Sequence, residues 1–414
     1  MELTAESLKK VVEQDAAIRR VQRLQPSGGK GDKIFPPTYP GEGNRDSPRH
    51  AFEMRRIEGK DIRCVLLDSV QSQANRLEYA LLEAMKAGVI ALPHIAVDFS
   101  GAKVNLSFDG NGKGAKPNFN SGKEYNLSDL GVITSLDAPH RIFDAIIRDS
   151  LKDGKPFTDT DDYRQLVLAK PTNALQVFKL SPTSLVFGAW NSHSEGGGLG
   201  ARFSRCVVSE IVGIGATDGL KTTSRIDPLG VKASVKVVGD AMNWSIAKGL
   251  EGEKTKKPSE VGHSNIRPEV VSGGVTIDHA LHTVVISCAG LRRLRFPGTK
   301  DEAAGRVVLA ALALTAVTQQ DTRGYALRSR CDLSPEKESQ FEIVKVNGDV
   351  ESVEIDADSA LHLLRETTSK SMEAGFPWDK EPLRLTPQER LVQLVALSRA
   401  KAFEGEEEEP KASV

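Results

Sequence analysis

The sequence predicts an α+β fold, an antiparallel sheet of the ferredoxin-like type that carries large insertions. Three observations lead to this prediction. An apolar strand at 63–67 runs directly into an amphipathic helix that ends near Met85. A long strand at 275–289 is followed by an alanine- and leucine-rich helix at 301–319 and a strand at 341–346. Polar stretches rich in glycine separate these elements, as expected of insertions in a two-layer domain.

The first 50 residues are predicted to form a helix followed by an extended arm. Leu8, Val11, Ile18 and Val21 recur with helical spacing and Thr4 suits the N-cap, which predicts a helix over 3–24. Five prolines and five glycines follow between positions 26 and 48. Because proline lacks a backbone donor and glycine is conformationally free, this stretch is predicted to be a loop or arm.

The predicted core spans 51–346 and begins with the strand at 63–67. Asp68 or Ser69 caps the helix that follows, and Leu77 and Leu81 lie on its buried face. A first insertion, at about 94–130, reads as strand pieces around a loop rich in glycine, asparagine and lysine.

Later core elements are predicted from shorter signals. Ser135 or Asp137 is expected to cap a helix that carries Arg141 and Arg148 on one face. The apolar runs at 184–190 and 204–212 predict two strands. A polar, lysine-containing insertion is expected at 240–274.

The C-terminal part is predicted to be helical. The helix at 301–319 is apolar nearly all round, which predicts that it is buried. Two helices are expected within 347–403, and the second opens with Thr386-Pro387-Gln388-Glu389, a capping box with proline at the first helical position. An acidic tail, 404–414, ends the chain and is expected to be disordered.

Composition and charge exclude several classes of protein. The 55 basic and 56 acidic residues give a net charge of −1, but the tail holds five acids and one base, so residues 1–403 carry +3. No CxxC occurs among four scattered cysteines, which argues against a zinc knuckle or a redox motif. The longest apolar stretch, about 11 residues, is too short to cross a membrane. We therefore expect a soluble, cytoplasmic protein without membrane association.

No cofactor, metal or catalytic site is predicted. The glycine-rich stretch 196–200 lacks the Lys-Ser/Thr of a phosphate loop, and 213–219 has the wrong spacing for a dinucleotide fingerprint. His279 and His282 lie three apart on a predicted strand and would point to opposite faces. His140 and Asp144, four apart on a predicted helix, have the spacing of an acid/base pair but equally that of an ordinary surface pair.

Arginine supplies the strongest chemical signal. Arginines recur beside serine, threonine, asparagine and glycine, as in Thr223-Ser224-Arg225 and in Arg328-Ser329-Arg330. As a strand, the latter would place both arginines on one face. Guanidinium forks, hydroxyls and exposed backbone N–H groups are the donors that a phosphate backbone requires. This pattern favours binding of nucleic acid.

Five segments resemble a known family in both content and order. They are LLDSVQSQANRLE (66–78), TSLDAPHR (134–141), FGAWNS (187–192), SRCVVSEI (204–211) and LRSRCDL (327–333). Together they resemble the RAMP-superfamily backbone subunit, of the "Cas seven" type, from type I-U (I-G) CRISPR effector (Cascade) complexes. The resemblance runs from about Phe35 to Leu333 and is less distinct over the last 80 residues.

The resemblance implies an RRM-like sheet with palm-and-thumb shape, and a role in antiviral defence. Copies of such a subunit assemble head-to-tail along a CRISPR RNA, alongside other effector subunits, and present the guide for pairing with target DNA. A separate protein cuts, so no catalytic residue is expected. The segment around α-helical positions 69–76 is similar to the family's guide-contacting helix. The resemblance thus implies nine RNA-binding residues: Gln71, Asn75, Arg76 and, less directly, Arg141, Arg202, Arg205, Arg225, Arg328 and Arg330.

Two alternatives stay open at this stage. The first is a RAMP endoribonuclease that matures CRISPR RNA with His140 or His193 as general acid/base, and metal-independent cleavage would favour it. The second is an unrelated metabolic enzyme whose arginines bind a small anion. A strictly monomeric mass and no co-purifying RNA would favour this second alternative.

Overall fold

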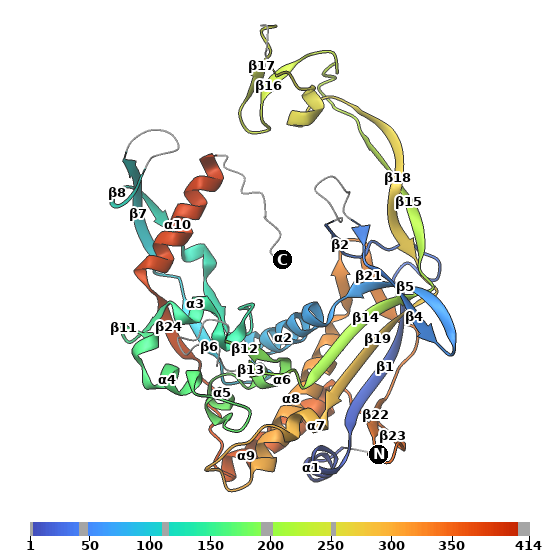
Figure 1. Ribbon diagram of the computed structural model, residues 1–414, viewed down its shortest axis with the longest axis vertical. Coiled ribbons are helices and arrows are strands. Elements are labelled where there is room, and N and C mark those ends of the chain that lie inside the picture. The colour runs from blue at the N-terminus through green and yellow to red at the C-terminus, as the bar shows by residue number, and fades with distance from the viewer. Residues whose placement is uncertain (1–2, 41–48, 110–115, 192–201, 250–253, 405–414) are drawn as a thin grey trace.

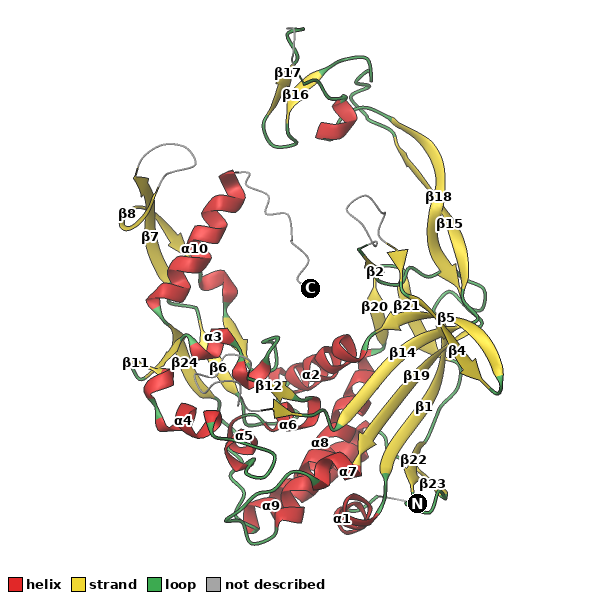
Figure 2. Ribbon diagram, in the orientation of Figure 1, coloured by secondary structure: helices red, strands yellow, loops and turns green. Residues whose placement is uncertain are grey.

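The computed structural model describes residues 3–40, 49–109, 116–191, 202–249 and 254–404. The acidic tail from 405 onward and His193 lie outside the described residues. The described chain combines helices with a main antiparallel sheet (Figures 1 and 2). The predicted α+β class with an antiparallel sheet is therefore confirmed.

The N-terminal segment differs from the prediction of one helix over 3–24. Helix α1, Ala5–Gln14, is capped by Thr4 as expected, but strand β1, Ala17–Pro26, follows it. In β1 every second side chain points to the core, from Ile18 to Leu24. Two of these inward positions are Arg20 and Gln22, and their polarity conceals the period of two that marks a strand.

Nine strands form the main sheet. Its path runs β20-β21-β1-β19-β14-β5-β4, and β22 pairs with β1 and with β23. The strands other than β1 are β4 (Phe52–Ile57), β5 (Lys60–Asp68), β14 (Val207–Ile214), β19 (His279–Ser287), β20 (Tyr325–Arg328), β21 (Cys331–Pro335), β22 (Phe341–Val344) and β23 (Val350–Val353). The predicted long strand 275–289 is thus divided at a turn between β18, which ends at Thr276, and β19.

Helices cover one face of this sheet and build the core. The predicted helix after the strand at 63–67 is confirmed as α2, Val70–Lys86, with Ser69 as its N-cap. The predicted buried helix is α8, Glu302–Arg323, in which most residues from Ala303 to Gln320 are buried. Helices α1 and α7 (Cys288–Arg292) pack beside α8, and α9 (Ala357–Glu373) packs against α8 (Figure 2). The alternating burial of β1 and β19 leaves the other sheet face half-exposed.

A second, five-stranded sheet lies beside the main one, in the order β11-β10-β24-β6-β9. Short helices surround it, and the predicted strand at 184–190 is mostly one of them, because Pro182 opens a helix that ends at Phe187. The elements are β6 (Ile95–Asp98), β9 (Val132–Thr134), β10 (Ser150–Lys152), β11 (Lys155–Pro156), β24 (Leu383–Pro387), α4 (Asp161–Val167), α5 (Leu175–Leu180), α6 (Pro182–Phe187) and β12 (Ala189–Trp190).

Two predicted helix starts are wrong. The segment after Asp137 forms only a 3-10 turn, Arg141–Phe143, and a four-residue helix α3, Ala145–Arg148. Arg141 has φ +53°, which interrupts a regular helix, so Arg141 and Arg148 do not share a helical face. Pro387 ends β24 instead of opening a helix, and the last helix, α10 (Glu389–Glu404), begins two residues later.

Two long projections extend from the same side of the molecule (Figure 1). One is the arm, which we define as residues 217–276. Strands β15 (Thr217–Arg225) and β18 (Ile266–Thr276) form its stalk, and β16 (Val237–Gly239) and β17 (Trp244–Ile246) lie at its tip. The predicted insertion at 240–274 lies within this arm. The other projection is the hairpin of β7 (Lys103–Asp109) and β8 (Lys116–Asn126), which belongs to the predicted insertion at 94–130. This hairpin packs beside α10.

No helix in the described part of the chain is long and apolar enough to cross a membrane. All four cysteines, Cys64, Cys206, Cys288 and Cys331, are buried free thiols.

Candidate nucleic-acid interface

The exposed face of α2 is polar and aromatic. Gln71, Asn75 and Tyr79 lie four residues apart and are exposed, because Leu77 and Leu81 turn the opposite face into the core. The side chains of Gln71 and Asn75 make no hydrogen bond with any described residue. Amide and ring groups in this row are positioned to contact a sugar-phosphate chain or a stacked base. In Figure 1, α2 lies at the centre of the side from which the two projections extend.

Arg76 joins α2 to the neighbouring hairpin of β20 and β21. Its Nε donates to Asp68 Oδ2 at 2.9 Å, and its Nη atoms donate to the carbonyl oxygens of Ala326, at 3.3 Å, and Leu327. These bonds use three of the five N–H groups of the guanidinium, so two remain for a ligand. With one third of its side chain exposed, Arg76 both stabilises the hairpin and faces solvent.

A buried row of hydrogen bonds holds Asp68 in place. Gln73 Nε2 donates to Asp68 Oδ2 at 2.6 Å, and Ser209 Oγ donates to Gln73 Oε1 at 2.8 Å. Since the single hydroxyl proton of Ser209 is used in this way, His282 Nε2, 2.8 Å from Ser209 Oγ, must donate to it. The proton of His282 thus lies on Nε2, and burial, which lowers the pKa of His282 to about 3, keeps the ring neutral at pH 7.

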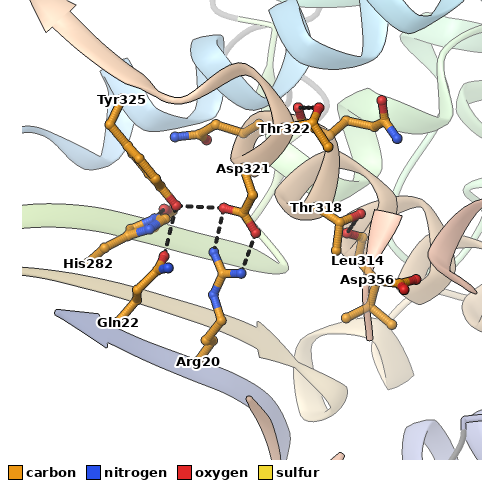
Figure 3. A network of polar contacts seen from close by, with 12 residues as sticks. Arg20, Gln22, His282, Leu314, Thr318, Asp321, Thr322, Tyr325 and Asp356 are labelled. Carbon is orange, nitrogen blue, oxygen red and sulfur yellow. Dashed lines mark hydrogen bonds and ion pairs between the residues drawn. The ribbon is translucent and has the colours of Figure 1, made fainter. Parts of the chain in front are cut away.

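A second network fixes the start of β20 (Figure 3). Arg20 of β1 forms two hydrogen bonds with the carboxylate of Asp321, one of them at 2.8 Å. The Tyr325 hydroxyl lies 2.5 Å from Asp321 Oδ1 and 2.9 Å from Gln22 Oε1. These bonds join β1, the end of α8 and β20, and explain why polar side chains occupy inward positions of β1.

The inner end of the interface contains two arginines and one buried carboxylate. Arg141 holds Glu78 of α2 through two bonds of 2.8 and 2.7 Å and donates to the Gly188 carbonyl at 3.0 Å. Burial raises the pKa of Glu78 to about 7 in spite of Arg141. Since Arg141 is itself buried and its Nε and both Nη atoms donate to protein groups, it has the geometry of a structural ion pair and not of a phosphate ligand.

Arg205 lies next to this pair and is exposed. It makes no hydrogen bond or ion pair with a described residue, and partial burial and repulsion from Arg141 lower the pKa of Arg205. Gly188, at φ +82°, lets it approach, because a Cβ there would lie 2.9 Å from Arg205 Cγ. One carboxylate thus faces two guanidiniums, and the surplus positive charge favours binding of an anion.

A cation–π pair extends this end of the interface. Strand β13, Arg202–Phe203, pairs with β12, and the Arg202 guanidinium lies 4.9 Å from the ring centroid of Trp190. Trp190 is 53% exposed, so both groups face solvent. A guanidinium beside an exposed indole suits a nucleotide, because one binds phosphate and the other stacks on a base.

At the other end of α2, the β20–β21 turn carries Arg328 and Arg330. Both are exposed, but Arg330 has φ +57° in the turn, so the two do not alternate along one strand as predicted. Arg330 lies over the ring of Phe35 at 4.9 Å, and Arg328 donates to the Pro36 carbonyl at 3.4 Å. These contacts attach the turn to the proline- and glycine-rich segment that follows β1.

The predicted site residues therefore fall into three groups. The first group lies on α2, on or just after β13, and on the β20–β21 turn: Gln71, Asn75, Arg76, Arg202, Arg205, Arg328 and Arg330. Arg141 is buried beneath them. Arg225 lies apart in the arm, where it donates to the carbonyls of His263 and Ser264 at 2.7 Å.

Sequence reasoning missed three residues of this face. Tyr79 continues the row of Gln71 and Asn75, and Arg323 lies over its ring at 5.3 Å. Trp190 is the third. For Tyr79 the spacing of four from Asn75 was an available signal, whereas the pairing of Trp190 with Arg202 depends on the tertiary fold.

The predicted pairing of His140 with Asp144 as acid and base is not seen in the structure. The Asp144 carboxylate accepts from the backbone N–H groups of His140 and Ile146, both at 2.9 Å, so it caps α3 and does not orient the His140 ring. Within the described ranges, no group of His, Cys, Asp and Glu has the arrangement of a metal site.

One of the comparisons with known proteins identifies a related family. Residues 18–218 match the sequence model of a family described as CRISPR-associated protein GSU0053. The match covers just under half of the chain and includes α2 and both arginines of the β13 region. This match supports the conclusion that the chain is a CRISPR-associated protein.

The other comparisons add no evidence. No curated protein matches the chain. Among solved structures, the crystal structure of Thermofilum pendens Csc2 is similar over 90% of this chain and 81% of that chain, with 11% sequence identity and a TM-score of 0.25. A TM-score this low carries no conclusion about fold or function.

Proposed function

We propose that this protein is a non-catalytic, CRISPR-RNA-binding backbone subunit of a type I-U/I-G effector complex. The RNA backbone lies along the exposed face of α2, between the β20–β21 turn and Arg205. The observation that carries the proposal is the surplus cation at Arg205, which continues the polar row of α2 within the range that matches the CRISPR-associated family.

The chemistry of the face suits a guide that must remain readable. Arg205, Arg328 and Asn75 offer donors to phosphate and ribose, and none of them lies in a deep pocket that would enclose a base. A subunit that contacts only the backbone leaves the base edges available for pairing with target DNA.

The finer architecture belongs to the same proposal. The main sheet acts as an RRM-like palm, and the arm acts as the thumb. Nine large apolar side chains in the described part of the arm are exposed, which supports contacts of the arm with the RNA, with further head-to-tail copies of this chain or with other effector subunits. They are Leu220, Ile226, Leu229, Val235, Met242, Trp244, Ile246, Ile266 and Val270.

The test is the salt dependence of RNA binding. For Arg205→Ala we expect weaker binding of all single-stranded RNA sequences to a similar degree, with the slope of log K against log salt reduced by roughly 0.7. Arg164→Ala is the matched control, since Arg164 is 66% exposed on α4, away from this face. An unchanged slope for Arg205→Ala, or an equal loss for Arg164→Ala, would contradict the proposed interface.

A further inference from the structure

A second concave surface lies between the end of α2 and α9. It is a hollow of about 780 Å³, lined by Met85, by residues 88–91 that follow α2, and by α9 from Leu364 to Met372. Its volume falls within the roughly 300–1,000 Å³ of typical ligand pockets. Its floor is continuous with the hydrophobic core, and none of the residues that line it belongs to the proposed RNA interface.

The chemistry of this hollow is apolar with a positive rim. Leu364 and Trp378 are buried in its floor, whereas Val89 and Met372 are exposed at its edge, Met372 by 51%. The cations that line it are Lys380 and Arg365, and Arg365 Nη2 also donates to the Val89 carbonyl at 3.1 Å. Burial lowers the pKa of His94, so this residue adds no positive charge near pH 7, and no carboxylate of the described chain lines the hollow. Methionine adapts its shape to varied apolar partners, and unneutralised cations favour a negatively charged one.

The hollow continues into a second one, of about 380 Å³, that shares His94 and Lys380. Lys152 and Lys179 also line the second hollow, together with the carboxylates of Asp162, Asp379 and Glu381, and Lys152 pairs with Asp162 at 2.7 Å, so its charges are largely balanced internally. The surplus positive charge therefore belongs to the first hollow. Two connected, open hollows form an elongated path, which suits a length of polypeptide better than a compact small molecule.

We propose that this groove binds a segment of a partner protein that combines apolar side chains with Asp or Glu. The apolar side chains enter the floor between Met85 and Met372, and the carboxylates meet Arg365 and Lys380. In Figure 1, α9 lies at the end of the molecule away from the arm, so such a partner and RNA can be bound together. The inference does not depend on the proposed RNA-binding function.

Fluorescence anisotropy with labelled peptides tests this proposal. The probe is a peptide of about 12 residues, roughly 40 Å when extended, in which Leu and Phe alternate with Glu. Two control peptides replace every Glu by Lys, or every Leu and Phe by Ser. With the full-length protein we expect the Glu peptide to bind at least about 10-fold more tightly than either control, a difference of about 1.4 kcal/mol.

Variants of exposed groove residues complete the experiment. We expect Met372→Glu to weaken the Glu peptide about 10-fold or more, and Lys380→Glu to shift the preference towards the Lys peptide. Met54→Glu is the matched control, because Met54 is 62% exposed on β4, an edge strand of the main sheet, and does not line the groove. The proposal is overturned by equal affinity for Glu and Lys peptides, by absence of binding at millimolar peptide, or by equal effects of Met372→Glu and Met54→Glu.

Discussion

Helix α2 and the arm both contribute to the proposed interface, but they are built in opposite ways. Helix α2 exposes one large apolar side chain, Tyr79, whereas the arm exposes nine among its described residues. Beneath α2, Asp68, Gln73 and Glu78 are buried and hydrogen-bonded to other elements. The arm is a two-stranded ladder with a small tip, and only a few of its side chains are buried.

This difference separates what the folded chain determines from what a partner must supply. Buried polar networks fix the positions of Arg76 and of the Glu78–Arg141 pair before any ligand binds, since each polar group needs its partner. A two-stranded ribbon has little stability of its own, and exposed apolar groups gain free energy only when another surface covers them. The helix is therefore a preorganised surface, and the arm is completed by binding.

The largest effect on stability is expected when the buried ion pair that supports α2 is disrupted. Arg141→Ala leaves the buried Glu78 carboxylate without its partner, which typically costs about 3–5 kcal/mol of the free energy of unfolding. Because a neutral carboxyl is less costly to bury, the loss should be smaller at pH 5.5 than at pH 8. Urea denaturation at both pH values measures it.

The double variant Glu78→Leu with Arg141→Met separates charge from packing. It removes both charges and should recover most of the loss, since hydrophobic replacements of a buried ion pair are often neutral or stabilising. A single variant Arg141→Ala within 1 kcal/mol of the wild type would show that α2 does not depend on this pair.

A second, smaller effect concerns the neutral His282 below α2. Its pKa of about 3 in the folded protein lies below the ordinary 6.5, so the unfolded chain binds the proton more tightly. This contribution to stability is complete above pH 6.5 and is lost as the pH falls towards 3. At pH 4.5 the loss amounts to roughly 2.7 kcal/mol, at about 1.36 kcal/mol per unit.

His282→Gln tests this contribution, because its amide can still donate to Ser209 but does not titrate. The raised pKa of Glu78 acts in the opposite direction, since its stabilising effect declines as the pH rises from 4.5 to 7. The measurement is therefore the difference between wild type and His282→Gln in denaturant unfolding at pH 7 and pH 4.5. A difference independent of pH would contradict the neutral, buried His282.

The same contrast explains which elements were predictable from sequence. Helix α2 was predicted because local signals agree: the Ser69 cap, the buried Leu77 and Leu81, and polar residues on the opposite face. Strand β1 was missed because Arg20 and Gln22 point inward. Their burial depends on Asp321 and Tyr325, about 300 residues later, and no local pattern contains that information.

The candidate site was predictable to a similar extent. The exposure of Gln71 and Asn75 follows from helical spacing, whereas the burial of Arg141 follows from its distant partner Glu78. In the sequence, an arginine that contacts a ligand cannot be distinguished from an arginine that stabilises the fold. Only the tertiary structure separates Arg141 from Arg205, which faces solvent and lacks a partner in the described chain.

The smallest effect on stability is expected in the arm. Ile226 and Met242 are 87% and 83% exposed, so Ile226→Ser with Met242→Ser should change the free energy of unfolding by less than about 0.5 kcal/mol. Leu77→Ala, at a buried α2 position, should in contrast cost about 2–5 kcal/mol. Sedimentation of the RNA-bound protein gives the complementary measurement, because the arm variant should form smaller assemblies. Two results would contradict this contrast with α2. The arm variant could lose as much stability as Leu77→Ala, which would show that these apolar side chains stabilise the isolated chain. It could also assemble as the wild type does, which would show that no partner covers them.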